Sequence, residues 1–267
     1  MAGEDFRSAS KIARRLMLTP LVARSLENWP SFMYNYALGI TPTAPYRFRS
    51  GARLRIARGV DHVPIIEVFL RQDYGEIPDG ATIVDLGANI GAFSIYAATT
   101  TRNCRLYAYE PMPAYFDLMQ RNVQLNGLEG VVECFNLAVA GDSDRRTLFD
   151  AGNGFHFPSL VAAVHQSERA STNVDCTSIA GIIGSNALAR IDVLKMDVEG
   201  AEYESLYGTP SNCFERIREI RMEYHELDAG RRNVRSLADF LKDRGYRIAR
   251  QQATTPTGGN LWAVQHD

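Results

Sequence analysis

The chain has 267 residues, 45% of them hydrophobic and 22% charged, which is enough for one large globular domain with a full core. Its four cysteines are widely spaced without a C-x-x-C pair, which argues against a disulfide framework or a cysteine zinc site, so we expect a cytoplasmic protein. The net charge is −2, and neither a basic domain nor an apolar run of about 18 residues is present, so nothing supports nucleic-acid binding or a transmembrane segment.

The first 75 residues are expected to form an extension to the main domain. Apolar residues between Ser10 and Ile40 recur at helical spacing, interrupted by Pro20 and Pro30, which predicts two or three short helices. The run YRFRSGARLRIARG alternates in polarity around a turn, as a β-hairpin does, and we expect it to cover an edge of the main sheet. This extension, residues 1–75, is expected to serve as a substrate lid or as the contact of a homodimer.

Residues 76–267 alternate between predicted strands and helices, which indicates a doubly wound α/β sheet. Most strands are apolar on both faces, as strands between two helical layers must be. The predicted strands are Thr82–Leu86, Arg105–Tyr109, Val131–Leu137, Ile191–Met196, Glu219–Tyr224, Tyr246–Ala249 and Leu261–Val264. Pro113 is expected to open one helix, and Ser236 is expected to cap another.

A polar, irregular insertion lies between Gly141 and Val174. An insertion of this length is typical of a lid or specificity loop, with partial disorder as the alternative. Its two histidines, His156 and His165, either contact a substrate or are solvent-exposed bystanders.

The run TIVDLGANIGAFS joins the first predicted strand to a helix that begins near Ala92. Gly87 and Gly91, with Asn89 between them, allow a sharp turn and a close approach of the backbone to a ligand. The amides at the helix start attract a carboxylate, and Asp85 attracts an ammonium group. The loop therefore predicts a ligand with an amino-acid end.

Glu110 ends the next strand, 19 residues after Gly91, where a carboxylate can accept both ribose hydroxyls of a nucleoside. Nicotinamide dinucleotides and S-adenosylmethionine both contain such a ribose. The loop lacks the middle glycine of G-x-G-x-x-G, which a diphosphate requires, and this favours S-adenosylmethionine as the cofactor. Tyr74 either reaches the carboxylate of this cofactor or packs the extension onto the sheet.

Acidic segments after two later strands supply candidates for chemistry, because methyl transfer to an alcohol needs a group that takes the hydroxyl proton. His225 is the first candidate for this base, since imidazole titrates near neutrality; its alternative role is to position its loop. Asp197 is the second candidate, with cofactor contact or helix capping as other roles, and Glu199 is the third. A divalent ion held by these acids is an alternative that their spacing does not establish. We expect Lys195 to pair with one of them.

Five segments stand in a fixed order over residues 60–265: EVFLRQDYGEIP, VDLGANIGAFSIYAA, YAYEPMPAYFDLMQRNVQLNG, VLKMDVEGAEYESL and EIRMEYHE. In this combination the chain resembles the FkbM-type methyltransferases. The resemblance implies a class I methyltransferase with a seven-stranded, mostly parallel Rossmann-like sheet and helices on both faces. It also implies use of S-adenosylmethionine, usually to methylate oxygen in natural-product or surface-glycan pathways, and it leaves the acceptor open.

The sequence therefore predicts an S-adenosylmethionine-dependent O-methyltransferase that acts on a hydroxyl of a sugar, a glycan, or a glycosylated or polyketide-like metabolite. A nicotinamide-dependent oxidoreductase shares Glu110 and the glycine turn, but it leaves the segments MDVEGAE and MEYHE without a role. A non-catalytic nucleoside-binding protein is the other alternative, and it has no need of Asp197 and His225 at the strand ends.

Overall fold

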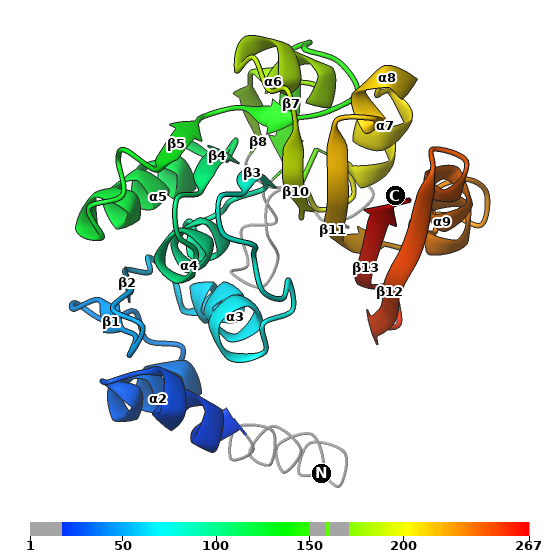
Figure 1. Cartoon of the computed structure of the whole chain (residues 1–267). Coiled ribbons are helices and arrows are strands. Elements are labelled where there is room, and N and C mark those ends of the chain that lie inside the picture. Colours follow the sequence, from blue (N-terminus) through cyan, green and yellow to red (C-terminus); the bar gives the residue numbers. More distant parts are fainter. Residues whose placement is uncertain (1–17, 150–158, 161–170, 267) are drawn as a thin grey trace, which may run out of the picture.

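The computed structural model describes residues 18–149, 159–160 and 171–266. Its centre is a seven-stranded sheet with the order β12-β13-β11-β10-β3-β4-β5 (Figure 1). Every neighbouring pair is parallel except the two that β13 makes with β11 and β12, so β13 runs against the other six strands. The strands are β3 (Thr82–Leu86), β4 (Arg105–Tyr109), β5 (Val132–Phe135), β10 (Ile191–Met196), β11 (Ile217–His225), β12 (Tyr246–Thr255) and β13 (Gly258–Gln265).

Helices cover both faces of this sheet, as predicted. Successive residues of a strand point to opposite faces, so the fully buried side chains of Ile83 and Val84 enter two different cores. The first core also holds α4 (Ala92–Thr100) and α5 (Pro113–Leu125). The second holds α6 (Ile179–Ser185), α7 (Glu202–Tyr207), α8 (Ser211–Phe214) and α9 (Val234–Lys242).

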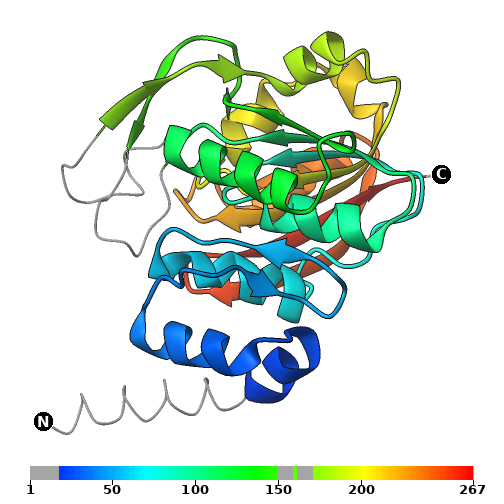
Figure 2. The same cartoon turned by 90° about the vertical axis from the view of Figure 1, so that its left-hand side faces the viewer.

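The N-terminal extension shares the first core with the main sheet, since Leu26 and Phe32 belong to the same cluster as Ile83. In Figure 2 its blue helices form the outermost layer, and the hairpin and α3 lie between them and the sheet. The extension contains a helix over residues 18–25, α2 (Trp29–Leu38), β1 (Tyr46–Arg47), β2 (Arg53–Leu54), η1 (Gly59–Asp61), α3 (His62–Ile65) and a π-helix, η2 (Ile66–Leu70). No helix in these described ranges is long and apolar enough to cross a membrane.

The β1–β2 hairpin does not cover an edge of the sheet, which corrects the sequence-based expectation. The edges are β5 and β12, and β2 instead contacts α5. The C-cap residue Asn126 exchanges two hydrogen bonds with the backbone of Arg53 in β2, and Asn122 exchanges two with the backbone of Arg55, just after β2, with lengths of 2.7 to 3.0 Å. Each amide side chain supplies the donor and the acceptor that a neighbouring strand would otherwise supply.

The insertion after Gly141 forms an antiparallel pair, β7 (Arg146–Phe149) and β8 (Ser171–Val174). Two short parallel strands, β6 (Ala138–Val139) and β9 (Cys176–Thr177), lie on either side of this pair in the sequence. His156 and His165 lie outside the described residues.

The predicted bounds of β3, β4 and β10 and the opening of α5 at Pro113 hold, whereas β5 is shorter than predicted and β11, β12 and β13 are longer. The N-cap of α9 is Asn233, whose side chain accepts the N–H of Ser236, so Ser236 is not the cap. Strand β12 continues to Thr255, past the predicted end at Ala249, because it pairs with β13 along its whole length with two register shifts.

Candidate active site

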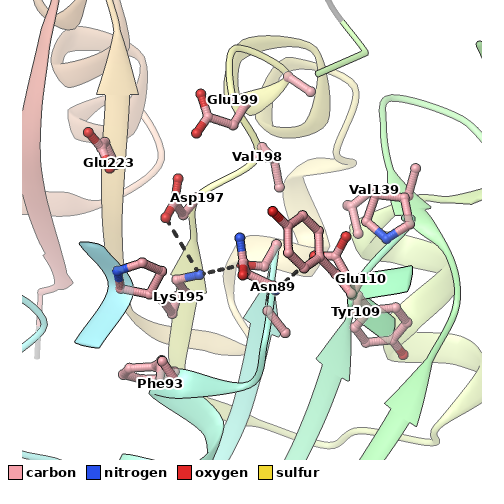
Figure 3. A pocket seen from close by; sticks show the side chains of 18 of the residues that line it. Asn89, Phe93, Tyr109, Glu110, Val139, Lys195, Asp197, Val198, Glu199 and Glu223 are labelled. Atoms are coloured by element: carbon pink, nitrogen blue, oxygen red, sulfur yellow. Dashed lines mark hydrogen bonds and ion pairs between the residues drawn. The ribbon is translucent and has the colours of Figure 1, made fainter. Parts of the chain in front are cut away.

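A cavity lies at the carboxyl ends of β3, β4 and β10. From β3 the chain proceeds to β4 and β5 on one side, and then returns to place β10 on the other side. Ligands of doubly wound sheets bind at such a switch point. Figure 3 shows Tyr109 and Glu110 at one end of the cavity, and Asp197, Glu199 and Glu223 toward the other.

The glycine loop after β3 is held by its own hydrogen bonds. The N–H of Gly87 donates to the carbonyl of Tyr109, and the N–H of Asn89 donates to Glu110. Asn89 lines the cavity with a φ of 53°, a conformation that few non-glycine residues adopt. A Cβ on Gly87 would lie 1.8 Å from the carbonyl oxygen of Asp197. The glycine is therefore required where two protein loops touch, whereas we had expected a close approach to a ligand.

Helix α4 begins at the wall of the cavity. Gly91 is its N-cap with a φ of 81°, and Ala92 and Phe93 line the cavity. The first N–H groups of a helix have no intrahelical acceptor, and the helix dipole favours an anion there. This helix start therefore has the properties predicted for the carboxylate end of a ligand.

Asp85 is fully buried and does not line the cavity. Its carboxylate accepts a hydrogen bond from Ser94 Oγ at 2.7 Å and forms an ion pair with Lys195 Nζ at 3.1 Å. Lys195 lines the cavity, and although burial opposes its charge, Asp85 and Asp197 outweigh this effect and raise its pKa. The expected contact of Asp85 with a ligand stays a prediction. The shorter ion pair of Lys195 is this one with Asp85, and its expected pairing with the acids after β10 is the 3.9 Å contact with Asp197.

Glu110 lines the cavity at the end of β4, as predicted. Its Oε2 accepts the N–H of Asn89 at 2.7 Å, and its Oε1 accepts the N–H of Met112 at 2.9 Å. Burial raises the pKa of Glu110 to about 7, although these two hydrogen bonds act to lower it. Each carboxylate oxygen has a further lone pair, so the group fits the ribose hydroxyls of S-adenosylmethionine.

The opposite end of the cavity is an acidic wall, formed by Glu67, Asp197, Glu199 and Glu223. Burial and then the charge of Asp197 raise the pKa of Glu67 to about 7, of Glu199 to about 8 and of Glu223 to about 9. The sequence analysis did not predict Glu67, the first residue of the segment EVFLRQDYGEIP. Glu67 lies on the π-helix η2, whose wider turn does not follow the periodicity of an α-helix. Among the residues described here, no group of three or more His, Cys, Asp or Glu is arranged to hold a metal ion.

His225 ends β11 and does not line the cavity. Its Nδ1 lies 3.1 Å from Glu202 Oε1, and its Nε2 lies 3.4 Å from Glu199 Oε2. Burial lowers its pKa, but the hydrogen bond to Glu202 and the charges of Glu202, Glu199 and Glu223 outweigh burial and raise it to about 10. A protonated imidazole cannot accept a proton, so this geometry argues against His225 as the general base at neutral pH.

Tyr74 connects the extension to the acidic wall. Its hydroxyl donates to Asp197 Oδ2 at 3.4 Å, and its ring packs edge-on against Phe93 with centroids 5.4 Å apart. Tyr74 therefore packs the extension against the main domain, which was one of its two expected roles. The other, a contact with the cofactor carboxylate, stays a prediction. Asp197 Oδ2 is also 3.9 Å from Lys195 Nζ, so Asp197 is held from two sides.

The strand order, the reversed strand β13 and the cavity at the switch point define a class I methyltransferase. The chain belongs to the FkbM methyltransferase family, because the methyltransferase FkbM domain matches residues 85–248. This membership makes the chain a methyltransferase and sets aside both the nicotinamide-dependent oxidoreductase and the non-catalytic binding protein.

Three relatives illustrate the family. Methyltransferase sdnD of Sordaria araneosa is 30% identical over an alignment of 209 residues that covers 68% of this chain and 79% of the relative. The 31-O-demethyl-FK506 methyltransferase FkbM of Streptomyces tacrolimicus is 25% identical, over 71% of this chain and 81% of the relative. The hexuronic acid methyltransferase AglP of Haloferax volcanii is 27% identical, over 65% of each chain.

Proposed function

We propose that the chain transfers the methyl group of S-adenosylmethionine to a hydroxyl oxygen of a small-molecule or glycan acceptor. The acceptor class that we infer is a sugar, a glycan, or a glycosylated or polyketide-like metabolite, and two relatives are named for FK506 and for a hexuronic acid. The observation that carries the proposal is the placement of Glu110 and the acidic wall at opposite ends of one cavity. A nucleoside held by Glu110 extends toward carboxylates that can take a proton.

The cavity offers one group for each part of the cofactor. Glu110 would hold the ribose hydroxyls, the start of α4 at Ala92 and Phe93 would hold the carboxylate, and Asp197 would hold the ammonium group. When bound, S-adenosylmethionine supplies an electrophilic methyl group and departs as a neutral thioether. The protein needs in addition only to align the acceptor and to remove its proton.

Glu199 is the carboxylate that we assign as general base. Its pKa of about 8 lies near neutrality, where a proton acceptor is most effective. Its φ of 51° is uncommon for a residue with a side chain, and such strained backbone is concentrated at functional sites. With S-adenosylmethionine bound to supply the methyl group, Glu199 would take the proton of the acceptor hydroxyl.

Residues 1–75 and the insertion would select the acceptor. The extension contributes Val63, Pro64 and Glu67 to the cavity lining, and the insertion contributes Leu148 and Leu160. These contacts support the lid role of the extension, and the homodimer contact stays a prediction.

The test is transfer of a tritiated methyl group from S-adenosylmethionine to a panel of demethylated macrolides, hexuronic acid glycosides, neutral glycosides and matched amines. We expect label in an alkali-stable ether, with turnover reduced by about 100-fold or more in Glu199→Gln. Glu215→Gln, on the exposed surface, is the matched control and should retain wild-type turnover. Label found only in amines, or undiminished transfer by Glu199→Gln, would refute the proposal.

A further inference from the structure

Three side chains connect the buried core to the cavity through consecutive contacts. Glu202, on α7, is fully buried, and its Oε1 lies 3.1 Å from Nδ1 of His225. Nε2 of His225 lies 3.4 Å from Glu199 Oε2. Glu199 lines the cavity, whereas Glu202 and His225 do not. The imidazole therefore bridges a buried carboxylate and the carboxylate that we assign as the base.

The structure fixes the imidazole and its buried partner in place. The backbone carbonyl of His225 accepts the hydroxyl of Tyr203 at 2.7 Å, which ties the end of β11 to α7. Glu202 Oε1 also accepts the N–H of Gly200 at 3.0 Å, so the same oxygen holds both the imidazole and the loop that carries Glu199. Oε2 of Glu202 is buried without a hydrogen-bond partner in the described part of the chain. The neighbouring imidazolium of His225 therefore compensates the cost of burying this carboxylate.

The charges around Glu199 explain why a cation is needed there. Asp197, Glu202 and Glu67 all act to raise the pKa of Glu199, and His225 is the neighbour that acts to lower it. Glu223 faces His225 from within the same strand. Lys195, a cation that lines the cavity, pairs with Asp85 and Asp197 rather than with Glu199. With His225 present the pKa of Glu199 is about 8, and without this cation it would be higher, so a smaller fraction of Glu199 would be ionised near neutral pH.

We infer that His225 is a positioning residue, held as an imidazolium by Glu202, which orients the carboxylate of Glu199 and favours its ionised form for proton removal from the acceptor. The part of this inference that concerns proton removal rests on the proposed function. The arrangement itself can be tested without turnover.

The first experiment is NMR titration of the full-length protein with ¹⁵N- and ¹³C-labelled histidine, with the His225 signal assigned by its loss in His225→Gln. We expect this imidazole to stay protonated beyond pH 8, and its midpoint to fall by about one to three pH units in Glu202→Gln, because a nearby opposite charge shifts a titration by that amount. A neutral His225 at pH 7 in the wild type, or an unchanged midpoint in Glu202→Gln, would overturn the inference.

The second experiment is the pH profile of kcat/KM with the best hydroxyl acceptor from the panel. We expect the acid limb to move upward by about one to three pH units in His225→Gln, and by clearly less in His225→Arg, which keeps the positive charge. Lower activity with an unshifted limb would indicate a structural role only and would overturn the inference. His266→Gln changes an exposed histidine and is the control.

The two experiments separate the inference from the proposed function. If the wild type methylates no hydroxyl acceptor, the proposed function fails, and the NMR titration still decides whether Glu202 holds His225 as a cation. Calorimetry with S-adenosylhomocysteine should give Kd values within about threefold of wild type for His225→Gln, because His225 does not line the cavity. A larger loss would place His225 in cofactor binding and would contradict the role assigned to it.

Discussion

Replacing Lys195 by methionine would remove the cation that lies next to the glycine loop after β3. Asp85 would stay buried with Ser94 as its hydrogen-bond donor. The side chains of Lys195 and Asp85 are 4% and 0% exposed, and Nζ and Oδ1 are 3.1 Å apart. At an effective dielectric constant of about 20 this separation corresponds to roughly 5 kcal/mol of attraction, and removing one partner of a buried pair typically costs about 3–5 kcal/mol. We expect Lys195→Met to lower the free energy of unfolding by about 3 kcal/mol.

The double variant Asp85→Asn/Lys195→Met removes both charges, so it should be more stable than the two single effects added together, with a coupling energy of about 2 kcal/mol. Urea denaturation of the four proteins at pH 7, without ligand, measures this coupling. Calorimetry with S-adenosylhomocysteine on the same proteins then reports whether Asp85 affects the ligand through Lys195. Additive stability changes would refute the assignment of Asp85 to a structural ion pair.

Three further predictions concern the cavity. Gly87→Ala should lower the free energy of unfolding by about 3 kcal/mol, because the added Cβ would overlap the carbonyl oxygen of Asp197. A loss below about 1 kcal/mol in urea denaturation would contradict this prediction. Glu67 has a folded-state pKa of about 7 against an ordinary value of 4.5, so its contribution to stability is present below about pH 4.5 and is lost as the pH rises through 7. Glu67→Gln should therefore match wild type at pH 4 and exceed it by about 2 kcal/mol at pH 8, and equal melting curves at pH 8 would disprove the prediction. Glu110→Gln should weaken S-adenosylhomocysteine binding by about tenfold at pH 8, because hydrogen bonds from the ribose hydroxyls to a charged acceptor are lost. Calorimetry measures this change, and an unchanged affinity would show that Glu110 does not bind the ribose.

Local sequence patterns predicted much of the fold because strands between two helical layers must be apolar on both faces. The run TIVDL and the position of Glu110 at a strand end follow from this rule, and both were found where expected. The docking of the hairpin was not predictable, because it depends on Asn122 and Asn126, which lie about 70 residues away in sequence. Alternating polarity shows that a segment is extended and leaves its partner open.

The chemical roles at the site were harder to predict than the positions of the residues. His225 was expected to be a base because an isolated imidazole titrates near neutrality, but Glu199 and Glu202 lie against its two nitrogens and change its charge state. Glu67 joins the acidic wall from a segment about 130 residues before Asp197, so no local spacing relates the two. A proton affinity depends on the charges that the fold collects around a group, and these are known only in three dimensions.

The contact between Gly87 and the carbonyl of Asp197 also bears on attempts to exchange parts among relatives. The two loops meet without room for a single methyl group, so each has the shape that the other permits. A graft of either loop alone from a relative would bring together surfaces that were not selected as a pair. Chimeras intended to change the acceptor should therefore keep this junction intact and exchange residues 1–75 or the insertion, which reach the cavity from outside it.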